Sequence, residues 1–237
     1  MFFLEIKKQR FKKIHLIITK MKFEIRNAVV PLLVLNIVFF VLQMVLGRIF
    51  TNAFILISGD IITRPWILIT HMFLHGSPYH LLFNMYVLFL FGPLLENRIG
   101  TKRFFLIYFL SGIIAAIASS LIYPFIFNEP FIALGASGAI MGMLGVIIIL
   151  MPDLRVLFFF VVPMQLWMAA IILALIDVFG IFYPMGIANI AHLVGMGCGL
   201  LYGLNLKKEK RKFTKKFSSK TNLDSTDIDE YLRSGKI

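Results

Sequence analysis

The stretch GASGAIMGMLGVIIILM, residues 135–151, places a serine, Ser137, at the start of a long apolar run. The run contains no charged residue, and glycines recur in it at helical spacing, at positions 138, 142 and 145. Small residues along one side of an apolar helix are typical of close helix packing inside a membrane. The pattern predicts a membrane helix whose first turn carries a hydroxyl group beside unpaired backbone N–H groups.

The whole chain has the same apolar character. Of its 237 residues, 59% are hydrophobic and 15% are charged, and the mean hydropathy is +0.87. This composition excludes an ordinary water-soluble domain and predicts an all-α polytopic membrane protein. A helix needs about 20 residues to cross the hydrocarbon core. The segments of that length, or nearly so, are 29–49, 79–97, 103–123, 135–151, 163–183 and 187–206.

One further apolar segment, 54–74, is not expected to cross the membrane. Four residues interrupt it, namely Gly59, Asp60, Arg64 and Pro65. Irregular backbone at membrane depth has to be sheltered by protein. We therefore expect a bundle of six transmembrane helices with an interfacial loop between the first and second helices.

The basic residues indicate the orientation. Lys and Arg cluster in residues 1–28, in the turn 98–103 and in residues 207–220, and the positive-inside rule makes all three cytoplasmic. The net charge of +12 is therefore a topology signal, and no nucleic-acid partner is expected. The chain divides into a basic N-terminal segment (1–28), a membrane domain (29–206) and a flexible tail (207–237) that is basic and then acidic. No removable signal peptide is expected, and the plasma membrane of a prokaryote is the default location.

Polar side chains gather at one membrane depth. The second, fourth and sixth spans run in the same direction, so their first turns share the outer third of the membrane. His80 and Asn84 open the second span, Ser137 opens the fourth, and His192 lies one turn into the sixth. These four hydrogen-bonding side chains are the candidate site.

The candidate site suits nucleophilic catalysis. A serine hydroxyl needs a base to remove its proton, and His192 is the only histidine in the predicted spans outside the group 71–80. Packing through Gly138 and Gly195 would bring the base to the serine. We predict a Ser–His dyad. Asp177, near the outer end of the fifth span, is expected to meet a neighbour's polar group or water and not to complete a triad.

Acyl transfer also needs hydrogen-bond donors for an oxyanion. His80 and Asn84 lie four residues apart on one helical face, and they could aim at the same point as the amides of the helix that starts at Ser137. The alternative for His80 and Asn84 is hydrogen bonding between helices. The alternative for the glycines, including Gly135, is packing alone.

Four motifs in this order resemble the rhomboid intramembrane serine proteases over roughly residues 30–205. The motifs are His71-Met-Phe-Leu-His75-Gly-Ser-Pro-Tyr-His80-Leu-Leu-Phe-Asn84, Glu96-x-Arg98-x-Gly100, Gly135-x-Ser137-Gly138 and Ala191-His192-x-x-Gly195. The resemblance implies a six-helix fold that cleaves transmembrane protein substrates near the outer face without a cofactor. Ser137 would be the nucleophile and His192 the general base, with His80 and Asn84 supporting the oxyanion.

The resemblance also implies features away from the dyad. Segment 50–78 would be the interfacial loop, Glu96 and Arg98 a structural pair at the inner side, and the fifth span a gate for lateral entry of substrate. Two departures stand out. Met141 occupies the position where many relatives carry an aromatic residue, and the loop has Arg64-Pro65-Trp66 where a Trp-Arg pair is common.

Three other classes of function compete with a serine protease. A zinc site could use His71, His75 and His80, but no His-Glu-x-x-His motif occurs, so no metal is expected. A catalytically silent rhomboid-like protein would bind membrane clients, but such proteins typically lose the serine or the histidine. A transporter would line its path with charged residues, and away from the ends of the spans only Asp177 qualifies.

Overall fold

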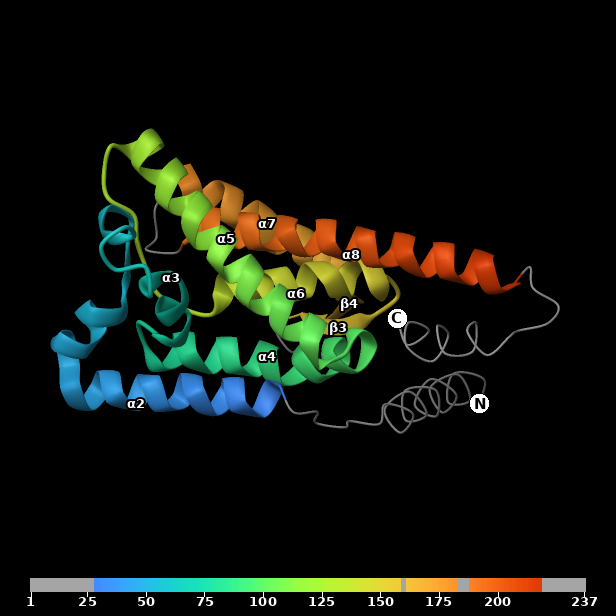
Figure 1. Cartoon of the computed structure of the whole chain (residues 1–237), viewed down its shortest axis with the longest axis horizontal. Helices are drawn as coiled ribbons and strands as arrows, with labels where there is room; N and C mark the ends of the chain where they lie inside the picture. Colours follow the sequence, from blue (N-terminus) through green and yellow to red (C-terminus); the bar gives the residue numbers. More distant parts are fainter. Residues whose placement is uncertain (1–27, 159–160, 183–187, 219–237) are drawn as a thin grey trace, which may run out of the picture.

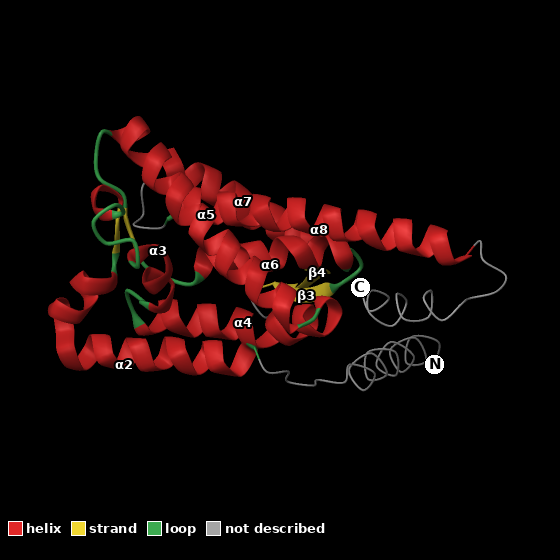
Figure 2. Ribbon diagram, in the orientation of Figure 1, coloured by secondary structure: helices red, strands yellow, loops and turns green. Residues whose placement is uncertain are grey.

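The structure is a computed structural model that describes residues 28–158, 161–182 and 188–218. Helices dominate it (Figure 2), and a helix lies at each of the six predicted segments. The long helices are α2 (Val29–Phe54), α4 (Pro78–Ile99), α5 (Thr101–Phe127), α6 (Ser137–Leu150), α7 (Leu166–Phe182) and α8 (Asn189–Ser218). The basic segment 1–27 and the acidic end of the tail, 219–237, lie outside the described residues.

The helices identify an integral membrane protein. Among the described residues, α2, α4 and α5 are long and apolar enough to cross a membrane, and α6 and α7 are shorter apolar helices. Many large apolar side chains on α2 and α7 are exposed, among them Met44, Val45 and Phe179. Such faces suit contact with lipid. Six crossings remain a prediction.

Helix α6 forms the centre of the bundle (Figure 1), where it packs against α4, α5 and α8. Every residue from Gly138 to Ile147 is buried. A helix that is apolar and buried all round belongs to the interior of a bundle. The segment that opens with Ser137 is therefore the one around which the other helices are arranged.

Helices α6 and α8 approach each other until their backbones touch. A methyl group on Gly195 would lie 2.1 Å from the carbonyl oxygen of Gly138, and one on Gly199 would lie 1.9 Å from the carbonyl oxygen of Gly142. Both distances are far shorter than a van der Waals contact. Only glycine permits this separation, as the small-residue repeats of the two spans predict.

The segment between α2 and α4 is built from short elements. They are β1 (Leu56–Ile57), the 3₁₀ turn Ser58–Asp60, α3 (Ile67–Thr70) and the 3₁₀ turn His71–Phe73. β1 pairs antiparallel with β2 (Ile132–Ala133), which leads into α6. The long straight part of α2 ends at Gly47, whose φ of 63° and ψ of −141° are not helical, and a second helical piece continues at an angle to Phe54. The predicted loop boundary at residue 50 falls within that second piece.

Side chains of this loop bind the open end of α2. Arg64 Nη1 donates to the carbonyl of Asn52 (2.7 Å), and Trp66 Nε1 donates to the carbonyl of Ala53 (3.0 Å). Thr70 Oγ1 donates to the carbonyl of Phe54 (3.0 Å). The last carbonyls of a helix have no partner within the helix, so these three bonds replace the missing ones. The unusual Arg64-Pro65-Trp66 sequence therefore anchors the loop to α2.

Glu96, near the C-terminal end of α4, has different partners from those predicted. Its Oε1 accepts hydrogen bonds from Thr101 Oγ1 (2.7 Å) and from the backbone N–H of Ala28 (3.2 Å). Glu96 and Arg98 form no ion pair in the part of the chain that the structure describes. Residues two apart on a helix face different sides, so Glu96 is buried while Arg98 is exposed. Glu96 instead joins the start of α2 to the start of α5.

Helix α8 extends beyond the predicted span. The tail was expected to be flexible from residue 207, but the helix continues to Ser218. Lys, Glu and Arg, which fill residues 207–212, are good helix formers, so the helix need not end where it leaves the apolar region. Glu209 accepts a hydrogen bond from Asn205 (3.1 Å) and pairs with Arg103 of α5 (3.6 Å).

Two histidines of the loop are buried. His71 Nδ1 donates to the backbone carbonyl of Ile67 (2.7 Å). Neither ring nitrogen of His75 has a hydrogen-bond partner among the described residues. Burial lowers the pKa of His71 to about 4. Burial, together with the neighbouring charge of His80, lowers the pKa of His75 to about 4.

We expect Gly199→Ala to destabilise the protein by about 1–3 kcal/mol, because the added methyl group would force α8 away from α6. Thermal unfolding of the purified protein in detergent measures the change. Gly197→Ala is the matched control on the same helix, since a methyl group there meets no atom within 4 Å. Equal melting temperatures for the two variants would contradict the close packing of α6 and α8.

We expect acidification to destabilise the protein. The pKa of His75 is about 4 in the folded chain and 6.5 in a model peptide, so the unfolded chain binds more protons between these values. Stability is therefore complete above about pH 6.5 and is lost as the pH falls toward 4. His75→Phe should reduce this loss while leaving stability at pH 8 nearly unchanged. Melting curves from pH 8 to pH 5 test this, and identical pH dependence in both proteins would disprove it.

Candidate active site

Ser137 stands at the first position of α6, directly after a turn that requires glycine. Gly135 has φ of 125°, a conformation that side chains rarely adopt. Its N–H donates to the carbonyl of His71 (2.9 Å), and a methyl group on it would lie 2.7 Å from the ring of His80. The turn therefore presents Ser137 at the helix N-terminus, where backbone N–H groups have no helical acceptor.

The structure brings Ser137 and His192 together. Ser137 Oγ lies 2.7 Å from His192 Nε2, a hydrogen-bond distance. The two residues are 55 positions apart in the chain and lie on α6 and α8. The contact between Gly138 and Gly195 brings these helices close enough for the bond.

His192 has a second polar partner, Asp177 of α7. Its Nδ1 lies 3.0 Å from Asp177 Oδ1, and only 4% of Asp177 is exposed. Asp177 was expected to meet a neighbour's polar group, and that group is the imidazole of His192. Membrane depth alone does not identify this partner. The missing signal was helical spacing, because Asp177 falls on the same face of α7 as the buried Leu166, Ala169 and Ala170.

His80 and Asn84 lie in the first turns of α4. Ser77 caps this helix through a bond from the N–H of His80 (3.1 Å), and Pro78 begins it, a usual N-terminal pattern. The ring of His80 lies against Gly135 and is near enough to His192 for their charges to interact. Buried Asn84 donates one amide hydrogen to the carbonyl of His80 (3.0 Å) and keeps a second.

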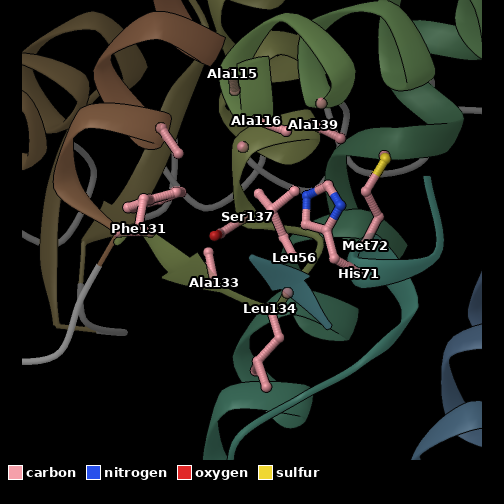
Figure 3. A pocket seen from close by; sticks show the side chains of 15 residues that line it. Leu56, His71, Met72, Ala115, Ala116, Phe131, Ala133, Leu134, Ser137 and Ala139 are labelled. Carbon is pink, nitrogen blue, oxygen red and sulfur yellow. The ribbon is translucent and has the colours of Figure 1, made fainter. Parts of the chain in front are cut away.

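A small apolar cavity adjoins Ser137. Its volume is about 20 Å³, close to the space of one water molecule. Ser137 lies within the lining, with Phe131 and Ala133 on one side and His71 on the other (Figure 3). The remaining walls are mostly small or apolar residues of α5, α6 and α8. The hydroxyl group thus faces a space that accepts a small apolar group.

The histidines of the loop and of α4 have other contacts. Within residues 28–158, 161–182 and 188–218, no group of three His, Cys, Asp or Glu side chains is placed to hold a metal ion. His71 Nδ1 is bound to backbone, and the His75 and His80 rings meet edge to face with centroids 5.0 Å apart. At the candidate site, the contacts of His192 place the Ser137 hydroxyl beside an oriented imidazole.

Comparison with known proteins gives the same family as the motifs. Residues 63–209 match the family model of the Rhomboid domain. "Rhomboid protein 1, mitochondrial" of Saccharomyces cerevisiae is 33% identical over 192 residues, which is 79% of this chain and 55% of the yeast protein. The Bacillus subtilis protein YdcA is 38% identical over 150 residues, 62% of this chain and 71% of that protein.

A third relative carries a name that states an activity. "Rhomboid protease GluP" of Bacillus subtilis is 42% identical over 83 residues, which is 35% of this chain and 15% of that protein. The chain therefore spans 55% of the yeast relative and a small part of GluP. The family match covers more than half of this chain and includes all four motifs of the candidate site. The resemblance is confirmed, and this chain belongs to the rhomboid family.

Proposed function

We propose that the protein is an intramembrane serine endopeptidase that cleaves transmembrane protein substrates near the outer membrane face. The observation that carries the proposal is the 2.7 Å contact between Ser137 Oγ and His192 Nε2. A hydroxyl group hydrogen-bonded to an imidazole inside an apolar bundle is a nucleophile paired with its base. The name of GluP, a rhomboid protease, supports the same class of reaction.

In the first half of the reaction, Ser137 Oγ attacks the substrate carbonyl carbon while its proton passes to His192 Nε2. The tetrahedral oxyanion then collapses, the C–N bond breaks, and the imidazolium gives its proton to the leaving amine. In the second half, His192 takes a proton from water as the water attacks the acyl-enzyme. The Ser137 Oγ–C bond breaks, and the proton returns to Ser137 Oγ. The net change is the addition of one water molecule across a peptide bond.

The oxyanion would be stabilised by donors at the start of two helices. The backbone N–H of Ser137 is one of the unpaired groups at the N-terminus of α6, where the helix dipole favours negative charge. The second amide hydrogen of Asn84 and the ring of His80 would complete the set. Each such donor contributes roughly 10²- to 10³-fold to the turnover rate in enzymes of this kind.

The proposed setting is a lipid bilayer crossed by six spans, with both termini in the cytoplasm of a prokaryote. The basic clusters at the chain ends support this orientation. Relatives include a protein named as mitochondrial and two Bacillus subtilis proteins. The charge pattern supports the orientation, and the prokaryotic plasma membrane is proposed as the default location. The reaction uses no cofactor and no metal. A silent client-binding protein is the alternative, but a hydrogen-bonded Ser–His pair would have no use in it.

We expect Ser137→Ala to abolish reaction with a fluorophosphonate probe in detergent, and cleavage of a transmembrane substrate to fall by about 10⁴-fold or more. His192→Ala should have the same effect, because the unassisted hydroxyl is a poor nucleophile.

Ser119→Ala on α5 is the matched control for this test. Ser119 is buried and its hydroxyl has no hydrogen-bond partner among the described residues, so losing it should leave labelling unchanged. A folded wild-type protein that does not label would favour the client-binding alternative.

A further inference from the structure

The contact between Asp177 and His192 joins the candidate base to a third helix. We propose that Asp177 is a positioning residue for His192, whose carboxylate selects the imidazole tautomer that can take the proton of Ser137. The inference rests on the proposed function, because Asp177 can position a catalytic base only if His192 acts as that base. It adds a residue of α7 to a site that the sequence places on α4, α6 and α8.

The burial of Asp177 indicates a specific partner. Its side chain is 6% exposed, and that of His192 is 16% exposed. A carboxylate inside a membrane bundle is costly unless a hydrogen bond compensates for lost water. Among the described residues, His192 Nδ1 is the only side-chain group bonded to it. The hydrogen bond between the carboxylate and the imidazole therefore compensates both groups for the water that they lose on burial.

The two bonds of His192 fix its tautomer. Neutral imidazole carries its proton on one nitrogen and accepts on the other. Nε2 must be the acceptor if it is to take the proton of Ser137 Oγ, 2.7 Å away, so the ring proton must sit on Nδ1. Asp177 Oδ1, 3.0 Å from Nδ1, accepts that proton in a hydrogen bond and cannot donate one when ionised. The carboxylate thus excludes the tautomer that would leave Ser137 without a base.

The same carboxylate acts when the proton moves. As Ser137 attacks, its proton binds Nε2 and the ring becomes a cation with protons on both nitrogens. Asp177 then lies beside a positive charge and stabilises it, without itself taking the proton. When Nε2 passes the proton to the leaving amine, the ring returns to the neutral form that it had at the start.

Close packing of α7 on α8 supports this bond. Gly180 lies one turn beyond Asp177 on α7, and a methyl group there would be 2.5 Å from the side chain of Asn189, at the start of α8. Asn189 in turn lies one turn before His192. The pairs 177–192 and 180–189 therefore form adjacent contacts between the two helices. The orientation of the base depends on α7 lying against α8 at this point.

A purely structural bond between α7 and α8 would also explain the contact, so the test must separate the two roles. Wild-type protein, Asp177→Asn and the chemically matched control Asp60→Asn are reacted with the fluorophosphonate probe in detergent. Asp60 pairs with Arg64 in the loop. We expect Asp177→Asn to label about 10²- to 10⁴-fold more slowly, since the amide can hold the wrong tautomer, while Asp60→Asn labels at the wild-type rate.

The tautomer of His192 is the readout that a purely structural role would not move. Without the carboxylate as an acceptor, the neutral ring can carry its proton on either nitrogen, so ¹⁵N-histidine spectra of Asp177→Asn should no longer show the Nδ1-protonated form alone. A variant with the wild-type labelling rate and the wild-type tautomer would overturn the proposal.

A measurement on the wild-type protein covers the case in which Asp177→Asn does not fold. The chain has five histidines, so ¹⁵N-histidine spectra compared with those of His192→Ala assign the ring of His192. The proposal requires a protonated Nδ1 and an unprotonated Nε2 at neutral pH, and the opposite tautomer overturns it. Failure of the wild type to label at all would instead contradict the proposed function, so the two failures are distinguishable.

Discussion

The contact between the backbones of α6 and α8 is the constraint on which the rest of the structure depends. Gly195 and Gly199 of α8 lie so close to the carbonyls of Gly138 and Gly142 of α6 that neither α8 position has space for a methyl group. Helices in lipid gain little from the hydrophobic effect, so van der Waals contact at this distance is a main source of their association. The same contact sets the 2.7 Å distance from Ser137 Oγ to His192 Nε2. Packing and chemistry therefore rest on the same glycines.

Several polar groups of the bundle show a second constraint, which is the need for hydrogen-bond partners where water is scarce. The carbonyls at the end of α2 are bound by Arg64, Trp66 and Thr70 of the loop. Buried Glu96 accepts hydrogen bonds from the hydroxyl of Thr101 and from the backbone N–H of Ala28. These bonds hold α2, the loop and α5 around α4, and so they fix the helix that carries His80. The site is supported from both ends of the bundle.

The sequence predicts the parts of this arrangement that depend on one helix at a time. Composition and apolar segments give the helices, and the spacing of small residues gives the close pair α6 and α8. The helical repeat places His80 and Asn84 on one face. Features that depend on contacts between two helices, or between a helix and a loop, are harder to predict from the sequence. The partners of Glu96 come from the starts of α2 and α5, and a second helical piece follows the kink at Gly47 into the predicted loop. Helix α8 extends to Ser218 because the charged residues after its apolar part have high helix propensity.

Asp177 shows why the direction of a side chain is the hardest feature of the site to predict from the sequence. Membrane depth can be estimated from the chain, but the direction in which a side chain points requires the helix to be placed against a neighbour. Within α7 only Leu166, Ala169, Ala170 and Asp177 are buried, whereas ten consecutive residues of α6 are buried. The least enclosed of the helices that meet at His192 therefore carries the group bonded to Nδ1. If His192 needs that bond to act as a base, the orientation of its ring depends on α7 packing against α8. The contact between α6 and α8 alone does not set that orientation.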